Sequence, residues 1–350
     1  MKKFIFSLFL ILLVSECAGM PDIFNGIFPG GNNVNKTELS PDLIIIKNIN
    51  VIPNPPINTL DQFSVSFEII NQDELKEASN VKYELYDWGL CDPLTTEGDP
   101  IVGTFDSLAP LQTEFKQWRF QAPDNNEIGY LSTRCPIRFK INYTYTSTSQ
   151  IDLDVISKDR LEQLQKAGTP PSFTPSLSVG RGPVKIYFSF GNELPIKSEN
   201  TISLFVKVED KGTGMFGEIK NKTLIINFPD GFKTADVDCG SKFNCTDNYL
   251  TVFCFPFFGQ KPTTENNVCD TNNDGIINMR DIQQTTNIIT EPTCYNNQEI
   301  PLIKKTSPQI RCSIKAPIVN VEKTFFIKGY LGYSYDVDGE TSVGVKPTSS

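Results

Sequence analysis

Strict alternation of apolar and polar residues is the feature that most constrains how this chain folds. The clearest segment is CPIRFKINYTYT (135–146), which places on one face Ile137, Phe139, Ile141, Tyr143 and Tyr145. Successive side chains of a strand point to opposite sides of a sheet, so a period of two residues indicates a strand with one buried face. The pattern recurs in QFSVSFEII, QIDLDVI, NTISLFVKVED and TFFIKGYLGYSYDV. We therefore predict an all-β protein.

The strand segments fall into two groups. About six or seven of them fit in residues 42–156, the number that a β-sandwich requires. A second group occupies residues 178–347 and keeps landmarks of the first in the same order, such as Ala122-Pro123 and Ala316-Pro317. Residues 157–177 contain a short helical stretch and then prolines, as expected of a linker. The prediction is two tandem immunoglobulin-like β-sandwiches related by duplication.

The N-terminus carries an export signal. Met-Lys-Lys is followed by eleven uncharged residues, FIFSLFLILLV, a run shorter than the about 20 residues of a membrane span. Cys17 follows in VSECAG and resembles the lipobox cysteine of prokaryotic lipoproteins, although Glu16 stands where that pattern has a small residue. We expect residues 1–17 to be a signal peptide in which Cys17 takes the lipid anchor, and residues 18–41 to be a flexible tether. Ordinary cleavage near Cys17, with release, is the alternative.

Composition excludes several classes of function. The chain has no histidine, which removes Ser-His-Asp and Cys-His catalytic systems and His-ligated zinc. The net charge is −9 and no Lys/Arg-rich run is present, so nucleic-acid binding is not expected. Carboxylate-pair hydrolysis stays open, because it needs only two acids that converge in space.

Nine cysteines fit an oxidising compartment. Cys17 aside, eight remain, and their spacing contains no C-x-x-C pair that would indicate zinc or redox chemistry. Confinement to the predicted domains suggests these disulfides: Cys91–Cys135, Cys239–Cys245, Cys269–Cys294 and Cys254–Cys312. The last three stay open, because six cysteines allow fifteen pairings. The sequons at Asn35, Asn142, Asn221 and Asn244 are compatible with glycosylation outside the cell.

The segment CDTNNDGIINMRDI (269–282) has the spacing of a calcium loop. With Asp270 counted as the first position, oxygen ligands fall at the positions that an EF-hand loop uses. The predicted ligands are the side chains of Asp270, Asn272, Asp274, Asn278 and Asp281 and the backbone carbonyl of Ile276. Gly275 stands at the sharp bend of that loop. These hard oxygen ligands favour Ca²⁺, with a Kd in the high-micromolar to millimolar range. The alternative is an Asn/Asp-rich turn without metal.

The calcium loop most resembles the half-motif of dockerin domains, D-x-N-x-D-G-x-[IV]-N-x-x-D followed by an exit helix. Dockerins carry two copies and this chain has one, so the resemblance implies the metal site at 270–281 and not cohesin docking. The loop lies in a predicted insertion, residues 255–300, within the second sandwich. An insertion of this size has no core of its own, so calcium and a disulfide would order it.

The order of strands, prolines and Ala-Pro pairs resembles the immunoglobulin-like CARDB and S-layer-associated modules of archaeal and bacterial surface proteins, and the whole chain resembles archaeal surface lipoproteins. The resemblance implies a surface scaffold or adhesion role and no catalytic residues. We therefore expect a non-enzymatic, calcium-binding protein at the extracellular face of the cell membrane. It would be held by its lipid anchor and contact a surface protein or glycan.

The rival function is a carboxylate-dependent hydrolase of envelope polysaccharide. A cleft with two carboxylates about 5–10 Å apart would favour it. Trp88 and Trp118 lie in strand patterns, so we expect them in the core rather than on a carbohydrate-stacking surface.

Overall fold

The computed structural model describes residues 41–169, 171–192, 194–246 and 292–348. Contacts group Ser40–Ser350 into one compact unit. The unit is built from antiparallel sheets, with one α-helix, α2 (Lys158–Lys166), among the described residues. This confirms the predicted all-β sandwich class. In the described part of the chain, no helix is both long enough and apolar enough to span a membrane.

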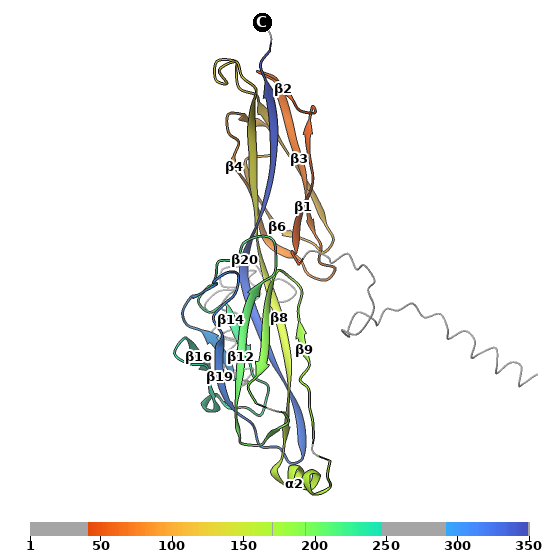
Figure 1. The fold of residues 1–350 in the computed structure, drawn as a ribbon, viewed down its shortest axis with the longest axis vertical. Helices are drawn as coiled ribbons and strands as arrows, with labels where there is room; N and C mark the ends of the chain where they lie inside the picture. Colours follow the sequence, from red (N-terminus) through yellow and green to blue (C-terminus); the bar gives the residue numbers. More distant parts are fainter. Residues whose placement is uncertain (1–40, 170, 193, 247–291, 349–350) are drawn as a thin grey trace, which may run out of the picture. The chain divides into compact units, whose positions relative to one another are not determined.

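The first sandwich packs a four-stranded sheet against part of a ten-stranded sheet (Figure 1). The four strands, in spatial order, are β1 (Ile44–Ile52), β3 (Gln62–Asn71), β7 (Thr113–Gln121) and β5 (Asp92–Gly98). The strands of the larger sheet in this half are β4 (Ala78–Asp87), β6 (Val102–Leu108), β2 (Ile57–Asn58) and parts of β8 and β20.

The second sandwich repeats this plan with another four-stranded sheet. Its strands, in spatial order, are β10 (Val184–Phe190), β12 (Thr201–Asp210), β19 (Ile310–Lys315) and β15 (Val237–Asp238). The ten-stranded sheet contributes β16 (Phe243–Thr246), β17 (Thr293–Asn296), β14 (Leu224–Asn227), β9 (Leu177–Val179), β11 (Ile196–Lys197) and the other parts of β8 and β20. Smaller elements are β13 (Glu218–Ile219), β18 (Ile300–Pro301) and the 3₁₀ helix η2 (Thr234–Asp236).

Two long strands run through both sandwiches. β8 (Thr133–Ile156) and β20 (Glu322–Lys346) pair antiparallel along their whole length, with no shift of register between them. Burial alternates along both strands with a period of two. Because an unbroken period of two keeps the same side chains on one face, the cores of both sandwiches lie on the same face of this two-stranded ribbon.

The shared strands differ from the expectation of two sandwiches divided at residue 156. Residues 149–156 of β8 pair with β9 and β11 of the second sandwich, and the end of β20 pairs with β2 of the first. The sequence pattern misses this continuity because the middle of β8 is Ser/Thr-rich. Ser147 and Ser149 are nevertheless buried, and their hydroxyls donate to the carbonyls of Val184 and Ser178.

The predicted core position of Trp118 is confirmed. Its side chain is 1% exposed and packs against Phe67 and Phe139, with ring centroids 4.8 and 5.2 Å away. The indole N–H donates to the carbonyl of Pro100 at 3.0 Å, so the buried polar atom is satisfied. Trp88 is half-buried and packs against the same core.

Candidate functional site

The residues predicted to bind lipid and calcium lie outside the described residues. This holds for Cys17 and for the whole loop 270–281, with Asp270, Asn272, Asp274, Ile276, Asn278 and Asp281. The structure does describe the strands on either side of residues 247–291, β16 and β17, which pair with each other.

The base of the segment is a short antiparallel ladder. Thr246 at the end of β16 pairs with Thr293 at the start of β17, so both ends of the segment lie on neighbouring strands. Cys245 and Cys294 are opposite each other in this ladder and form a disulfide. β17 also pairs with β14, and β14 with β20. The predicted insertion 255–300 therefore extends too far at its C-terminal end, because Thr293–Asn296 belongs to the sheet as β17.

The disulfides are partly as predicted. Cys91–Cys135 is confirmed, with the two Cα atoms 5.8 Å apart. In the second sandwich the predicted pairs Cys239–Cys245, Cys269–Cys294 and Cys254–Cys312 are wrong, because the observed bonds are Cys239–Cys312 and Cys245–Cys294. Sheet register explains the difference. Asp238 pairs with Ser313, which brings the following residue, Cys239, opposite Cys312. Cys254 and Cys269 lie outside the described residues.

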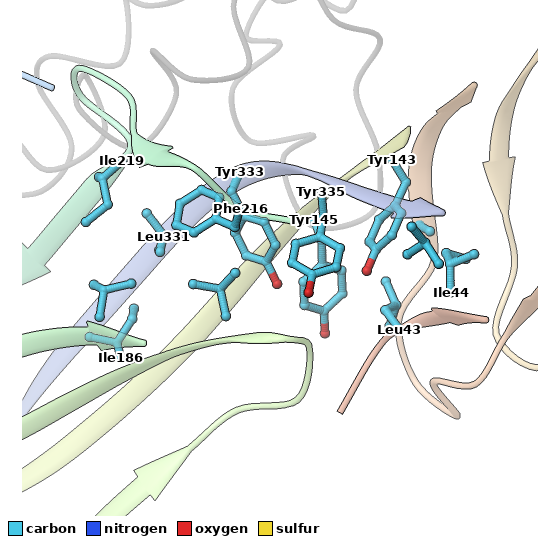
Figure 2. Close-up of a cluster of buried hydrophobic side chains, with 14 of the residues drawn as sticks. Leu43, Ile44, Tyr143, Tyr145, Ile186, Phe216, Ile219, Leu331, Tyr333 and Tyr335 are labelled. Carbon is cyan, nitrogen blue, oxygen red and sulfur yellow. The ribbon is translucent and has the colours of Figure 1, made fainter. Parts of the chain in front are cut away.

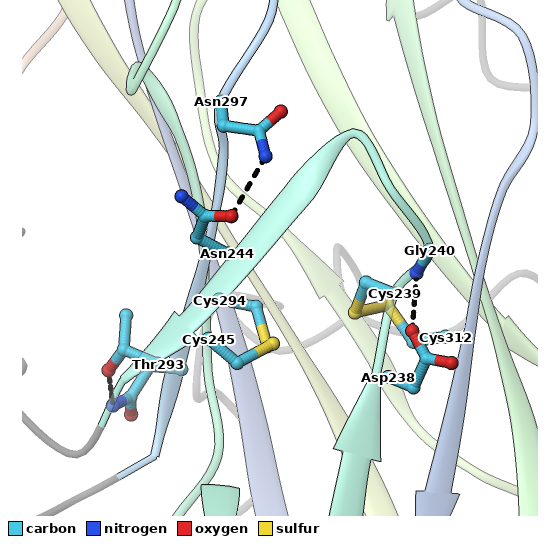
Figure 3. Close-up of a disulfide and its surroundings, with 10 residues drawn as sticks. Asp238, Cys239, Gly240, Asn244, Cys245, Thr293, Cys294, Asn297 and Cys312 are labelled. Carbon is cyan, nitrogen blue, oxygen red and sulfur yellow. Dashed lines mark hydrogen bonds between the residues drawn. A yellow bond between two sulfur atoms is a disulfide. The ribbon is translucent and has the colours of Figure 1, made fainter.

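The two disulfides of the second sandwich lie close to each other (Figure 3). One joins Cys239, the residue after β15, to β19 of the four-stranded sheet, and the other joins β16 and β17 of the ten-stranded sheet. The sulfur atoms of Cys239, Cys245 and Cys294 all lie within 4.8 Å of one another. No sequence pattern indicates this proximity, because the spacing of cysteines along the chain carries no information about which strands of the two sheets face each other.

The second notable site is the junction, defined here as the part of β8 and β20 where the chain passes from one sandwich to the other. Four inward-facing tyrosines occupy it: Tyr143, Tyr145, Tyr333 and Tyr335 (Figure 2). They form two cross-strand pairs, Tyr143 opposite Tyr335 and Tyr145 opposite Tyr333, with ring centroids 5.8 and 6.0 Å apart. Such aromatic pairs stabilise a sheet by roughly 0.2–1 kcal/mol each.

Buried carboxylates surround the second-sandwich side of the junction. The phenol of Tyr335 donates to Oδ1 of Asp210 at 3.0 Å, and Lys305 places its Nζ 3.4 Å from the other oxygen of that carboxylate. Asp42, just before β1, accepts from the amide and hydroxyl of Thr213, so it ties the first sandwich to the loop after β12. Burial, followed by the charges of Asp210 and Asp42, raises the pKa of Tyr335 far above its usual range.

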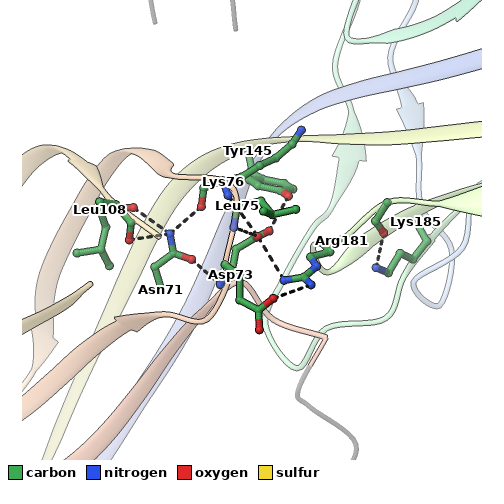
Figure 4. Close-up of polar contacts among 11 residues, drawn as sticks. Asn71, Asp73, Leu75, Lys76, Leu108, Tyr145, Arg181 and Lys185 are labelled. Carbon is green, nitrogen blue, oxygen red and sulfur yellow. Dashed lines mark hydrogen bonds and ion pairs between the residues drawn. The ribbon is translucent and has the colours of Figure 1, made fainter. Parts of the chain in front are cut away.

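The first-sandwich side of the junction repeats this arrangement (Figure 4). The phenol of Tyr145 donates to Oδ2 of Asp73 at 3.1 Å. Arg181, before β10, lies 3.6 Å from Asp73 and 3.1 Å from Glu74, so it ties the second sandwich to the loop after β3. Burial lowers the pKa of nearby Lys185, whose ammonium donates to a backbone carbonyl at 2.7 Å.

A buried polar residue ends the corresponding inner strand of each half. When the two halves are aligned in sequence at Pro56-Ile57 and Pro195-Ile196, Asn71 at the end of β3 corresponds to Asp210 at the end of β12. Both are buried. Each lies on the inward face of its strand, after a run of alternating apolar residues. A polar residue at that position was the sequence signal that could have predicted these buried polar sites. The buried carboxylates accept hydrogen bonds from protein groups, as structural carboxylates do.

The sequons lie in different settings. Asn142 sits within β8, and its amide donates to Ser334 and Asp336 of β20 at 2.9 and 2.7 Å. Asn221 and Asn244 are exposed, and Asn35 lies outside the described residues. No family model matches this sequence, and comparison with curated proteins gave no match either.

Proposed function

We propose that this protein is an exported surface protein, anchored in the cell envelope through Cys17, with a structural, adhesion or partner-binding role. The observation that carries the structural role is the β8–β20 ladder, which is continuous from Glu322–Ile156 to Val345–Thr133. Each sandwich completes its larger sheet with residues from both strands. A force applied to one sandwich therefore reaches the other through paired backbone rather than through a flexible linker.

The junction supports the same role. Asp42 and Arg181 each come from one sandwich and contact the loop of the other, while Tyr145 and Tyr335 donate to carboxylates at the ends of β3 and β12. Hydrogen bonds to charged groups contribute about 1.5–3 kcal/mol each when buried. Such contacts oppose bending at the junction, as a spacer that holds a binding surface away from the membrane requires.

We further propose that residues 270–281 bind calcium and that the ion orders the segment that leaves the sheet at Thr246 and returns at Thr293. The support is the spacing of the oxygen ligands and the disulfide Cys245–Cys294 at the base. With the base already closed, calcium has only the segment itself to order. Its effect is therefore local.

Limited proteolysis of the full chain with calcium or with chelator tests the metal site. Calcium should slow cleavage within 247–291 and leave the first sandwich unchanged, because a ligand stabilises the state that binds it. Asp270→Ala and Asp274→Ala each remove a charged ligand and should abolish the protection, while Asn278→Ala should do less. Asp338→Ala, an exposed carboxylate of β20, is the matched control and should keep full protection. Unchanged digestion in the native chain, with no binding heat at millimolar calcium, would overturn the proposal.

Membrane fractionation tests the anchor. The native protein should remain with membranes after a salt wash, because two acyl chains hold a protein firmly where one does not. Cys17→Ser should move it to the soluble fraction. An unmodified mature N-terminus at Ala18 or Gly19 would exclude the lipid anchor and leave the export proposal standing.

A further inference from the structure

Two disulfides face each other across the interior of the second sandwich, one from each sheet. Cys239, Cys294 and Cys312 are 6%, 0% and 0% exposed. Cys245 is only partly buried, at the sheet end where β16 and β17 meet. Cys245 is therefore the least buried of the four cysteines.

We propose that these four cysteines form a single thiol–disulfide exchange site, which a small-molecule thiol enters at Cys245. The observation is that the sulfur of Cys239 lies within 4.8 Å of the sulfurs of both Cys245 and Cys294. Forming a bond of about 2.05 Å from that separation requires side-chain shifts of roughly 3 Å in total. Rotation about Cα–Cβ bonds supplies movements of this size without unfolding the sheets.

The exchange is balanced in atoms and electrons. A thiolate RS⁻ attacks Sγ of Cys245, the RS–Cys245 bond forms, and the electron pair of the broken bond leaves on Cys294. The Cys294 thiolate then attacks Sγ of Cys239, which releases the Cys312 thiolate. Cys312 finally displaces RS⁻ from Cys245. Two disulfides are present before and after, and the thiol is regenerated, so the reaction has no net oxidant or reductant.

The disulfides of the product connect different strands from those of the starting state. Cys239–Cys312 and Cys245–Cys294 each join strands of one sheet, whereas Cys239–Cys294 and Cys245–Cys312 join the two sheets to each other. The exchange therefore converts two links within sheets into two links between sheets. Cys245–Cys294 also joins the two strands on either side of residues 247–291, so the exchange breaks this link between them.

A pair of single substitutions tests the site in the full chain. Cys312→Ser frees the thiol of Cys239, which should attack the neighbouring bond and leave a free thiol on Cys245 or Cys294. Cys239→Ser frees the thiol of Cys312 instead. The sulfur of Cys312 is not among the three that lie within 4.8 Å of one another, so its attack on Cys245–Cys294 should be at least tenfold slower than that of Cys239. Cys91→Ser is the matched control, because it leaves a buried free thiol at Cys135 in the first sandwich. In this variant the disulfides Cys239–Cys312 and Cys245–Cys294 should stay unchanged.

The readout is peptide mapping after acid quench and alkylation, at pH 7 and pH 8. The new bond should form several-fold faster at pH 8, because the thiolate is the attacking species and a free cysteine has a pKa of about 8.5. An alkylated Cys239 beside an intact Cys245–Cys294 after prolonged incubation of folded Cys312→Ser would overturn the proposal.

The unsubstituted protein provides a second measurement if Cys312→Ser does not fold. Incubation with a catalytic amount of free cysteine should produce Cys239–Cys294 and Cys245–Cys312, with the total number of disulfides unchanged. A mixed disulfide at Cys245 with no new protein pairing would overturn the exchange.

Discussion

Tyr335 and Asp210 are hydrogen-bonded at the junction of the two sandwiches, with the phenol oxygen 3.0 Å from Oδ1. Tyr145 and Asp73 make the corresponding contact on the other side at 3.1 Å. The two sandwiches therefore meet through two similar contacts, in which each long strand supplies one tyrosine. The junction is a built part of the core rather than a linker between two independent domains.

The first prediction is that both sandwiches unfold in one transition. β8 and β20 contribute to both cores, so neither sandwich keeps its larger sheet when the other is lost. Denaturation followed by tryptophan fluorescence reports the first sandwich through Trp88 and Trp118, and hydrogen exchange of β12 reports the second. The two curves should coincide, as a two-state transition requires. Midpoints separated by more than the experimental error would show that the halves are independent.

The second prediction concerns the junction tyrosines. Tyr335→Phe removes a donor from the buried carboxylate of Asp210 and should lower the free energy of unfolding by about 1–3 kcal/mol. Tyr143→Phe is the matched control, because the phenol oxygen of Tyr143 is buried without a hydrogen-bond partner among the described residues. Its removal should be neutral or stabilising. Chemical denaturation of the three proteins measures the differences, and equal losses in both variants would contradict the assigned role of Asp210.

The third prediction concerns two glycines near the junction. A Cβ at Gly212 would lie 2.1 Å from the phenol oxygen of Tyr335 and 2.2 Å from Oδ1 of Asp42, so Gly212→Ala must displace the polar contacts. Overpacking of this kind costs about 1–3 kcal/mol. Gly332→Ala, on β20, meets no atom within 4 Å and should be tolerated. Thermal unfolding compares them, and a stability of Gly212→Ala equal to the native value would show that the loop relaxes freely.

The fourth prediction is a loss of stability in alkali. Burial raises the pKa of Tyr143, Tyr333 and Tyr335 in the folded protein, whereas unfolded tyrosines keep a pKa of about 10. Above that pH the unfolded state binds fewer protons than the native state. The stability contributed by these tyrosines is thus complete below pH 10 and falls by about 1.4 kcal/mol per pH unit for each of them above it.

Tyrosinate absorbance measures this loss. The three buried tyrosines should titrate together with the loss of circular dichroism at high pH. Full ionisation with retained structure would contradict the buried environment of the junction. The variant Tyr335→Phe should show a shallower fall of stability with pH.

The sequence by itself determined which face of each strand is buried, because the two-residue period of apolar residues follows directly from strand geometry. It also led to Cys91–Cys135 and to the core position of Trp118, since both follow from residues within one half of the chain. The calcium loop at 270–281 rests on sequence alone and stays a prediction.

Only the tertiary structure decided which strands pair and where each sandwich ends. A period of two determines the buried face of a strand but not its partner, so nothing local in CPIRFKINYTYT or QIDLDVI indicated that they are one strand. Cys239 pairs with Cys312 because β15 lies beside β19. Asp210 is buried where Tyr335 donates a hydrogen bond to it and Lys305 forms an ion pair with it, and both partners come from distant parts of the chain. These contacts join residues far apart in sequence, and their register is set by the packing of whole sheets.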